Sequence, residues 1–225
     1  MAASFSFGCR TEPVVMPPAG LQGTLEIPES PSAVVVFAHG SGSSRHSPRN
    51  RQVAAALQRA GLATLLCDLL SEAEATDRQK VFDIGLLAHR LKAAVHCATS
   101  HAATEALPVG LFGASTGAAA ALVAAAERPG SVGAVVSRGG RPDLAGERHL
   151  QNLAAPTLLI VGGEDREVLG LNERARAWMT CPTELAIVPG ATHLFEEAGA
   201  LEQVAQLAAA WFRRWLAVEA GDGLA

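Results

Sequence analysis

The stretch that most constrains this chain is Gly113-Ala114-Ser115-Thr116-Gly117, which has the pattern Gly-x-Ser-x-Gly. The apolar run 109–112 precedes it, and the alanine-rich run 118–127 follows it. This order predicts a strand, a sharp turn and a helix, with the serine at the apex. Flanking glycines remove side chains that would collide in such a turn. Two interpretations fit the pentapeptide alone: a nucleophilic serine beside the positive end of a helix, or a glycine-rich turn with an incidental serine.

Short apolar runs alternate with longer helical segments along the whole chain. Strands are expected at 11–16, 21–27, 33–38, 62–67, 109–112, 132–136, 157–161 and 185–188, and helices at 48–60, 81–100, 118–127, 167–179 and 195–217. This alternation predicts an α/β fold, in which helices cover both faces of a mostly parallel sheet after an antiparallel entry hairpin. In such sheets the loops that leave the carboxyl ends of the strands share one edge, where ligands bind. No linker or repeat is evident, so one domain is expected over 1–225, with a compact core at about 20–217.

Composition excludes several classes of protein. The chain is 49% hydrophobic and carries a formal net charge of −4, so it has no basic footprint for nucleic acid. Its four cysteines form no Cys-x-x-Cys pair and suggest neither a zinc site nor a disulfide framework. The first ten residues do not resemble a signal peptide, and no apolar run could cross a bilayer. The expectation is a soluble cytoplasmic protein without a membrane or nucleic-acid partner.

Candidate partners for Ser115 follow two later strands. A serine hydroxyl needs a base to take its proton, and the base needs an acid to orient it. His193 follows the strand 185–188, and Asp165 follows the strand 157–161. Each has an alternative: His193 as a surface histidine, Asp165 as a cap of the next helix, and Glu164 as the acid in its place.

The glycine-rich loop after the strand 33–38 is the candidate for stabilising an oxyanion. A developing oxyanion needs two N–H donors about 3 Å away. One donor is expected to be the N–H of Thr116, at the start of the helix. The second is expected to be the N–H of Ser41, because Gly40 and Gly42 let the backbone approach a substrate. His39 is then interpreted as structural.

Four motifs together resemble the α/β-hydrolase superfamily: the segments 37–42, 113–117, 162–165 and 190–195. The small size and the Gly-x-x-His-x-Phe ending resemble the dienelactone hydrolase family. The resemblance implies an α/β-hydrolase fold with the chain order serine, acid, histidine, and neither a cofactor nor a metal. The hydrolases that give the family its name use cysteine as the nucleophile. The serine at position 115 therefore favours a general serine esterase over a dienelactone hydrolase.

The substrate side of the site is expected to be open, because too few residues separate the strands 132–136 and 157–161 for a cap domain. Two pairs of residues are candidates for contact with a small-molecule ester. Arg138 and Arg141 would lie in a loop at the mouth, where they attract an anionic acyl group or pair with acidic neighbours such as Asp143. Arg45 and His46 would line the pocket or face solvent.

These features predict a carboxylic ester hydrolase that works through an acyl-enzyme intermediate on Ser115. Two alternatives stay open. The same triad acts on thioester, amide or phosphotriester bonds, or the chain is a non-catalytic binding protein with a hydrolase fold.

Overall fold

The sheet of the protein follows the predicted plan. The computed structural model describes residues 8–217, whose strands form an eight-stranded sheet in the order β1-β2-β4-β3-β5-β6-β7-β8. The strands are β1 (Arg10–Met16), β2 (Leu21–Ile27), β3 (Ala33–Ala38), β4 (Leu62–Cys67), β5 (Val109–Ala114), β6 (Ala134–Arg138), β7 (Thr157–Gly162) and β8 (Thr183–Val188). β2 pairs antiparallel with β1 and β4, and every other pairing is parallel. This is the α/β-hydrolase fold.

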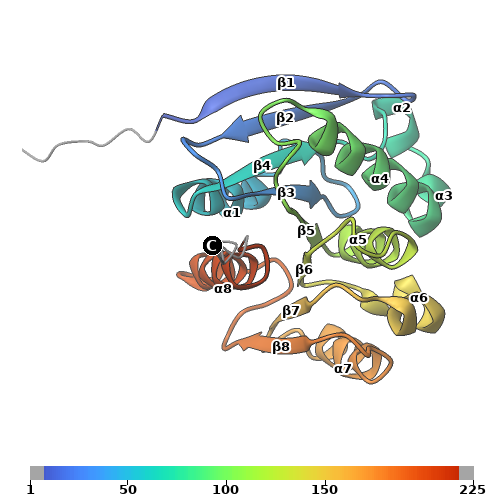
Figure 1. Cartoon of the computed structure of the whole chain (residues 1–225). Coiled ribbons are helices and arrows are strands. Elements are labelled where there is room, and N and C mark those ends of the chain that lie inside the picture. Colours follow the sequence, from blue (N-terminus) through green and yellow to red (C-terminus); the bar gives the residue numbers. More distant parts are fainter. Residues whose placement is uncertain (1–7, 218–225) are drawn as a thin grey trace, which may run out of the picture.

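Helices cover both faces of the sheet (Figure 1). One face carries α1 (Pro48–Arg59) and α8 (Ala200–Trp215). The other carries α2 (Glu72–Ala75), α3 (Arg78–Val81), α4 (Ile84–Ser100), α5 (Thr116–Glu127), α6 (Glu147–Asn152) and α7 (Arg166–Arg176). Between β6 and β7 the chain forms only the short 3₁₀ turn η1 (Pro142–Ala145) and α6, so no separate cap domain covers the sheet edge.

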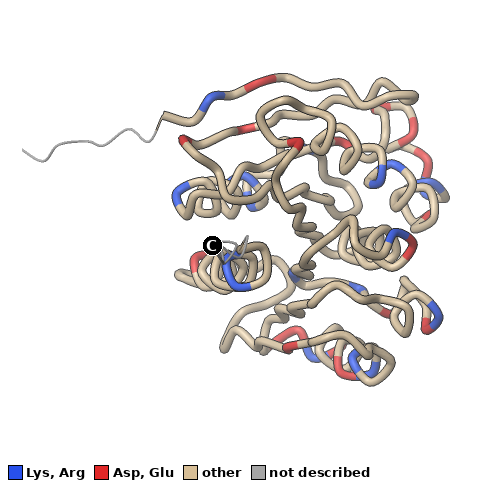
Figure 2. The backbone as a smooth tube through the Cα atoms, in the orientation of Figure 1, with Lys and Arg blue, Asp and Glu red and all other residues tan. Residues whose placement is uncertain are grey.

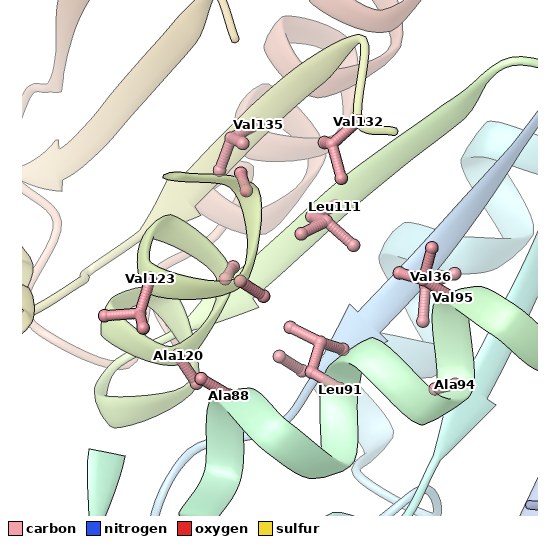
Figure 3. Close-up of a cluster of buried hydrophobic side chains, with 14 of the residues drawn as sticks. Val36, Ala88, Leu91, Ala94, Val95, Leu111, Ala120, Val123, Val132 and Val135 are labelled. Atoms are coloured by element: carbon pink, nitrogen blue, oxygen red, sulfur yellow. The ribbon is translucent and has the colours of Figure 1, made fainter. Parts of the chain in front are cut away.

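Alternation along β3 builds two hydrophobic cores. Val34 and Val36 pack on the side of α4 and α5, whereas Val35 and Phe37 pack on the side of α1 and α8. Successive side chains of a strand point to opposite faces, so a continuous run of apolar residues suits a strand that is covered on both sides. Figure 3 shows the first core, where Leu91 projects from α4 towards the sheet, beside α5.

The helix α5 is buried along almost its whole length. Residues 116–126 are all buried, and most of them are alanine. Alanine has the highest helix propensity and the smallest side chain that still favours a helix, so α5 can lie close to both the sheet and α4. The helix that follows the turn at residues 113–117 is therefore fixed in the centre of the molecule.

Several predicted boundaries differ from the structure, and two of these differences bear on the site. β6 covers Ala134–Arg138 rather than 132–136, because β5 continues to Ala114, which pairs with Arg138. Arg138 is thus a buried strand residue and does not lie in an exposed loop at the mouth. The last helix begins at Ala200 rather than at 195, because Phe195 and Gly199 have φ of 56° and 79°, outside the helical region.

Charged residues lie mainly on the helices and the outer strands (Figure 2). Within the five described strands β3 to β7, Arg138 is the one charged residue. Of the helices within 8–217, none has the length and apolar character needed to cross a membrane.

Candidate active site

Ser115 occupies a strained turn between β5 and α5. Its φ is 51° and its ψ is −121°, a conformation that side chains rarely adopt outside functional sites. The turn also requires glycine at its flanks. A Cβ on Gly113 would lie 2.4 Å from Cα of Ala118, and a Cβ on Gly117 would lie 2.4 Å from the carbonyl oxygen of Ala38. The pentapeptide is therefore a nucleophile elbow in its backbone geometry, with the serine at the turn between the end of β5 and the start of α5.

Asp165 and His193 meet across two neighbouring loops. Nδ1 of His193 lies 2.6 Å from Oδ2 of Asp165, which accepts the Nδ1 proton. With that proton held by the carboxylate, Nε2 of the neutral imidazole is the atom left to act as a base. Asp165 does not use its carboxylate to cap α7, and Glu164 is not the residue that lies at His193. The histidine is about one-third exposed, and Asp165 is mostly buried beneath it.

Main-chain contacts connect the segment after β6 to the elbow. The N–H of Ser115 donates to the carbonyl oxygen of Arg138 at 3.2 Å, and the N–H of Arg141 donates to the carbonyl oxygen of Ser115 at 3.2 Å. Between these two residues, Gly139 packs against the histidine: a Cβ there would lie 3.6 Å from Nδ1 of His193. The segment after β6 therefore touches both the elbow and the imidazole.

The loop after β3 lies against the other side of the elbow. A Cβ on Gly40 would lie 3.1 Å from Cβ of Ser115, so only glycine fits this approach without displacing the serine. The N–H of Ser41 donates to Oγ1 of Thr116 at 3.0 Å. The N–H of Ser41, the predicted second oxyanion donor, is thus already hydrogen-bonded to the Thr116 hydroxyl. The hydroxyl oxygen of Thr116 accepts this hydrogen bond, and the hydroxyl hydrogen is still available for donation.

His39 is a fixed structural residue beneath this loop. Nε2 accepts the N–H of Leu69 at 3.1 Å, so the ring proton is on Nδ1, which donates to the carbonyl oxygen of Gly40 at 3.0 Å. Burial lowers the pKa of His39, and the neighbouring Gly40 carbonyl and Asp68 only partly offset this. A neutral imidazole therefore ties the glycine loop to the segment after β4.

A cavity of about 530 Å³ opens beside the glycine loop. Its lining includes Ser41 and Thr116, together with the predicted substrate contacts Arg45 and His46. Arg45 is not free, because Asp68 accepts its backbone N–H at 2.8 Å and also binds its guanidinium. Asp68 follows β4 directly, so the strand-end rule that led to Asp165 and His193 could also have identified it.

The two arginines that were expected at the mouth are both engaged elsewhere. Nε and Nη2 of Arg141 bind the carboxylate of Asp143 at 2.9 and 2.8 Å. Arg138 lies 5.9 Å from the ring centre of Phe195, and its Nη2 is 3.4 Å from Oδ1 of Asn50. Burial and the nearby Arg49 lower the pKa of Arg138 to about 10. Across the described chain, Arg138 forms no ion pair, and its Nε has no hydrogen-bond partner.

No group of three or more His, Cys, Asp or Glu side chains within 8–217 is arranged to hold a metal ion. The four cysteines are unpaired thiols. Burial raises the pKa of the Cys67 thiol well above its ordinary value, so this cysteine is kept protonated inside the fold.

Comparison with known proteins identifies the family. Residues 31–211 match a family model described as an alpha/beta hydrolase domain. A crystal structure of dienelactone hydrolase from Anabaena variabilis ATCC 29413 is 54% identical, with a TM-score of 0.88 over 93% of this chain and 98% of that chain. The chain therefore belongs to the α/β-hydrolase superfamily, and within it to the dienelactone hydrolase-like family.

Other relatives differ in length or only share the fold. Two Mycobacterium tuberculosis proteins, each named "Putative phosphoribosyl transferase", are 60% identical over 199 residues, which is 88% of this chain and 45% of theirs. The chain thus spans about half the length of these curated relatives. Est1E from Butyrivibrio proteoclasticus, solved with ferulic acid, is 16% identical, with a TM-score of 0.76 over 92% of this chain and 100% of that chain. At that identity the likeness is one of fold.

Proposed function

We propose that this chain is a serine esterase that cleaves carboxylic esters of small molecules through an acyl-enzyme intermediate. The observation that carries the proposal is the 2.6 Å hydrogen bond from Nδ1 of His193 to Asp165, on the loops that follow β7 and β8. This bond gives the imidazole the tautomer in which Nε2 can accept a proton. The strained elbow at Ser115 supplies the corresponding nucleophile.

The reaction has two acyl-transfer steps. Nε2 of His193 takes the proton of Ser115 as Oγ attacks the ester carbonyl, and Asp165 stabilises the imidazolium. The proposed donors to the developing oxyanion are the N–H of Thr116, at the start of α5, and the hydroxyl of Thr116, which accepts the N–H of Ser41. His193 then gives its proton to the leaving alcohol. Water, activated by the same imidazole, attacks the acyl-enzyme and releases the acid.

Hydrolysis suits this chain better than phosphoribosyl transfer, the activity for which the mycobacterial relatives are named. That name belongs to proteins of which this chain matches less than half, whereas the hydrolase fold accounts for nearly all of this chain. The same triad could attack thioester, amide or phosphotriester bonds. A solved protein with this fold, 17% identical over 92% of the chain, is described as a dienelactone hydrolase-like promiscuous phosphotriesterase.

The test is Ser115→Ala with 4-nitrophenyl acetate as substrate. The variant should lose roughly 10⁴–10⁶-fold in kcat, because the nucleophile and its base act as a unit. Ser131→Ala is the matched control: Ser131 is exposed, its hydroxyl binds only the carbonyl oxygen of Arg128, and it lies at the opposite end of α5. Full activity of Ser115→Ala would rule out the serine esterase. A panel of thioester, amide and phosphotriester substrates compares the bond types.

A further inference from the structure

We propose that the cavity beside the glycine loop is the acyl pocket, and that it selects neutral apolar acyl groups against acyl groups that carry a carboxylate. This inference rests on the proposed esterase function and defines its substrate class. It is carried by three properties of the cavity: its position relative to the triad, its size, and the charges of its lining.

The position of the cavity assigns it to the acyl group. In the tetrahedral intermediate the carbonyl carbon carries Oγ of Ser115, the oxyanion, the leaving oxygen and the acyl carbon. The leaving oxygen must face His193, which gives it a proton. The cavity is lined by Gly40, Ser41 and Thr116, and no member of the triad is among the described residues that line it. It lies next to Ser115 through two of these residues: Thr116 follows the serine in the chain, and a Cβ on Gly40 would lie 3.1 Å from Cβ of Ser115. It therefore opens on the oxyanion side, away from the leaving group, where the acyl chain remains.

The size of the cavity suits an acyl group larger than acetyl. A cavity of about 150 Å³ holds one benzene molecule, so a cavity of about 530 Å³ has room for an acyl group of about six to ten carbons. Its apolar wall comes from three elements: Leu21 begins β2, Leu70 follows β4, and Leu87 lies on α4. Each methylene that this wall removes from water should raise kcat/KM about fourfold.

The charges of the lining disfavour a second carboxylate. Arg45 is the one arginine or lysine among the described lining residues, and Asp68 binds both its backbone N–H and its guanidinium. Glu72 adds a further negative charge to the rim. A carboxylate on the acyl chain would lose its hydration and meet two acidic side chains with no unpaired cation. His46 also lines the cavity.

The experiment measures kcat/KM at pH 8 for 4-nitrophenyl esters that differ only in the acyl group. Hexanoate should exceed acetate at least tenfold, and hexanoate should exceed the adipate half-ester, which has the same number of carbons, at least tenfold. Ala75→Trp and Val81→Trp place indole rings at two points of the cavity lining. Each should lower the hexanoate-to-acetate ratio at least tenfold.

Ala209→Trp is the matched control, because Ala209 lines a separate groove between α1 and α8. It should leave the ratio unchanged. The acyl-pocket assignment is overturned if neither tryptophan variant changes the ratio, or if the adipate half-ester is cleaved as well as hexanoate. Acetate turnover that does not depend on Ser115 would instead overturn the esterase itself, so the two failures are distinguishable.

Discussion

The loops after β7 and β8 and the loop after β3 meet at one edge of the sheet, but different contacts hold them. The first pair is joined through its backbone: the N–H groups of Gly163 and Glu164 donate to the carbonyl oxygens of Val188 and Ala191 at 2.9 and 3.0 Å. The loop after β3 is held by side chains that accept hydrogen bonds from backbone N–H groups. Asp68 accepts the N–H of Arg45, His39 accepts the N–H of Leu69, and Thr116 accepts the N–H of Ser41.

This difference separates chemistry from selectivity. Backbone contacts between neighbouring loops depend on the fold, so the acid and the histidine keep their geometry when other side chains change. Side-chain contacts change with single substitutions. We therefore expect substitutions on the acid–histidine side to abolish the reaction, and substitutions on the glycine-loop side to change its efficiency or its substrate preference.

Of three substitutions that compare these loops, Asp165→Asn should have the largest effect. The amide keeps the shape of the carboxylate but can hold the imidazole in the wrong tautomer and cannot stabilise the imidazolium, so kcat should fall roughly 10³–10⁴-fold. Asp143→Asn is the matched control, because Asp143 binds Arg141 near the elbow and should matter less than tenfold. Esterase assays on 4-nitrophenyl acetate check both variants. An active Asp165→Asn enzyme would show that the acid–histidine bond does not serve catalysis.

An intermediate effect should come from Thr116→Val. Valine nearly preserves the shape of threonine but leaves the N–H of Ser41 without its acceptor and removes a hydroxyl donor beside the oxyanion. We expect kcat to fall about 10–100-fold with little change in KM, because the oxyanion forms only in the transition state. Thr116→Ser keeps the hydroxyl and should stay within a few-fold of the unaltered enzyme. Equal activity of the two variants would exclude a role for the hydroxyl.

The smallest effect should come from Asp68→Asn, which releases the guanidinium of Arg45 into the acyl pocket. The ratio of adipate half-ester to hexanoate cleavage should rise several-fold, since a partly exposed ion pair is worth only about 1 kcal/mol. Asp77→Asn is the control, because Asp77 caps α3 and does not line the cavity. An unchanged ratio would mean that Arg45 does not face the acyl group.

Much of the fold was predictable because it depends on local features of the sequence: a turn that only glycine permits, and runs of apolar residues that form strands. Ser115 and the glycines around it can be read from the pentapeptide, and both Asp165 and His193 follow apolar runs that are unmistakable strands. The predicted β6 ended at Val136, because Ser137 and Arg138 are polar. The strand continues through both residues because its partner β5 continues, a cause that lies outside the local sequence.

The substrate side was less predictable because it depends on which side chains pair. The sequence offered Asp143 as a partner for Arg141, and the structure confirms this pair, but the sequence did not show that Asp68 binds Arg45. The hydroxyl of Thr116 was missed for a similar reason. The motif accounts for the backbone N–H of the residue after the nucleophile, while its side chain meets Ser41 only in the folded protein.

The most direct test of the catalytic assignment is covalent labelling with a fluorophosphonate, followed by peptide mapping. Attack by an activated serine forms a stable phosphonyl adduct, so one adduct should appear on the peptide that contains Ser115. The adduct should be lost in His193→Ala and retained in His149→Ala. His149 lies on α6, where its Nδ1 is hydrogen-bonded to the carbonyl oxygen of Ala145. An adduct on Ser115 that depends on His193 is the result we predict. A protein that stays unlabelled, or that is labelled equally without His193, would contradict the account.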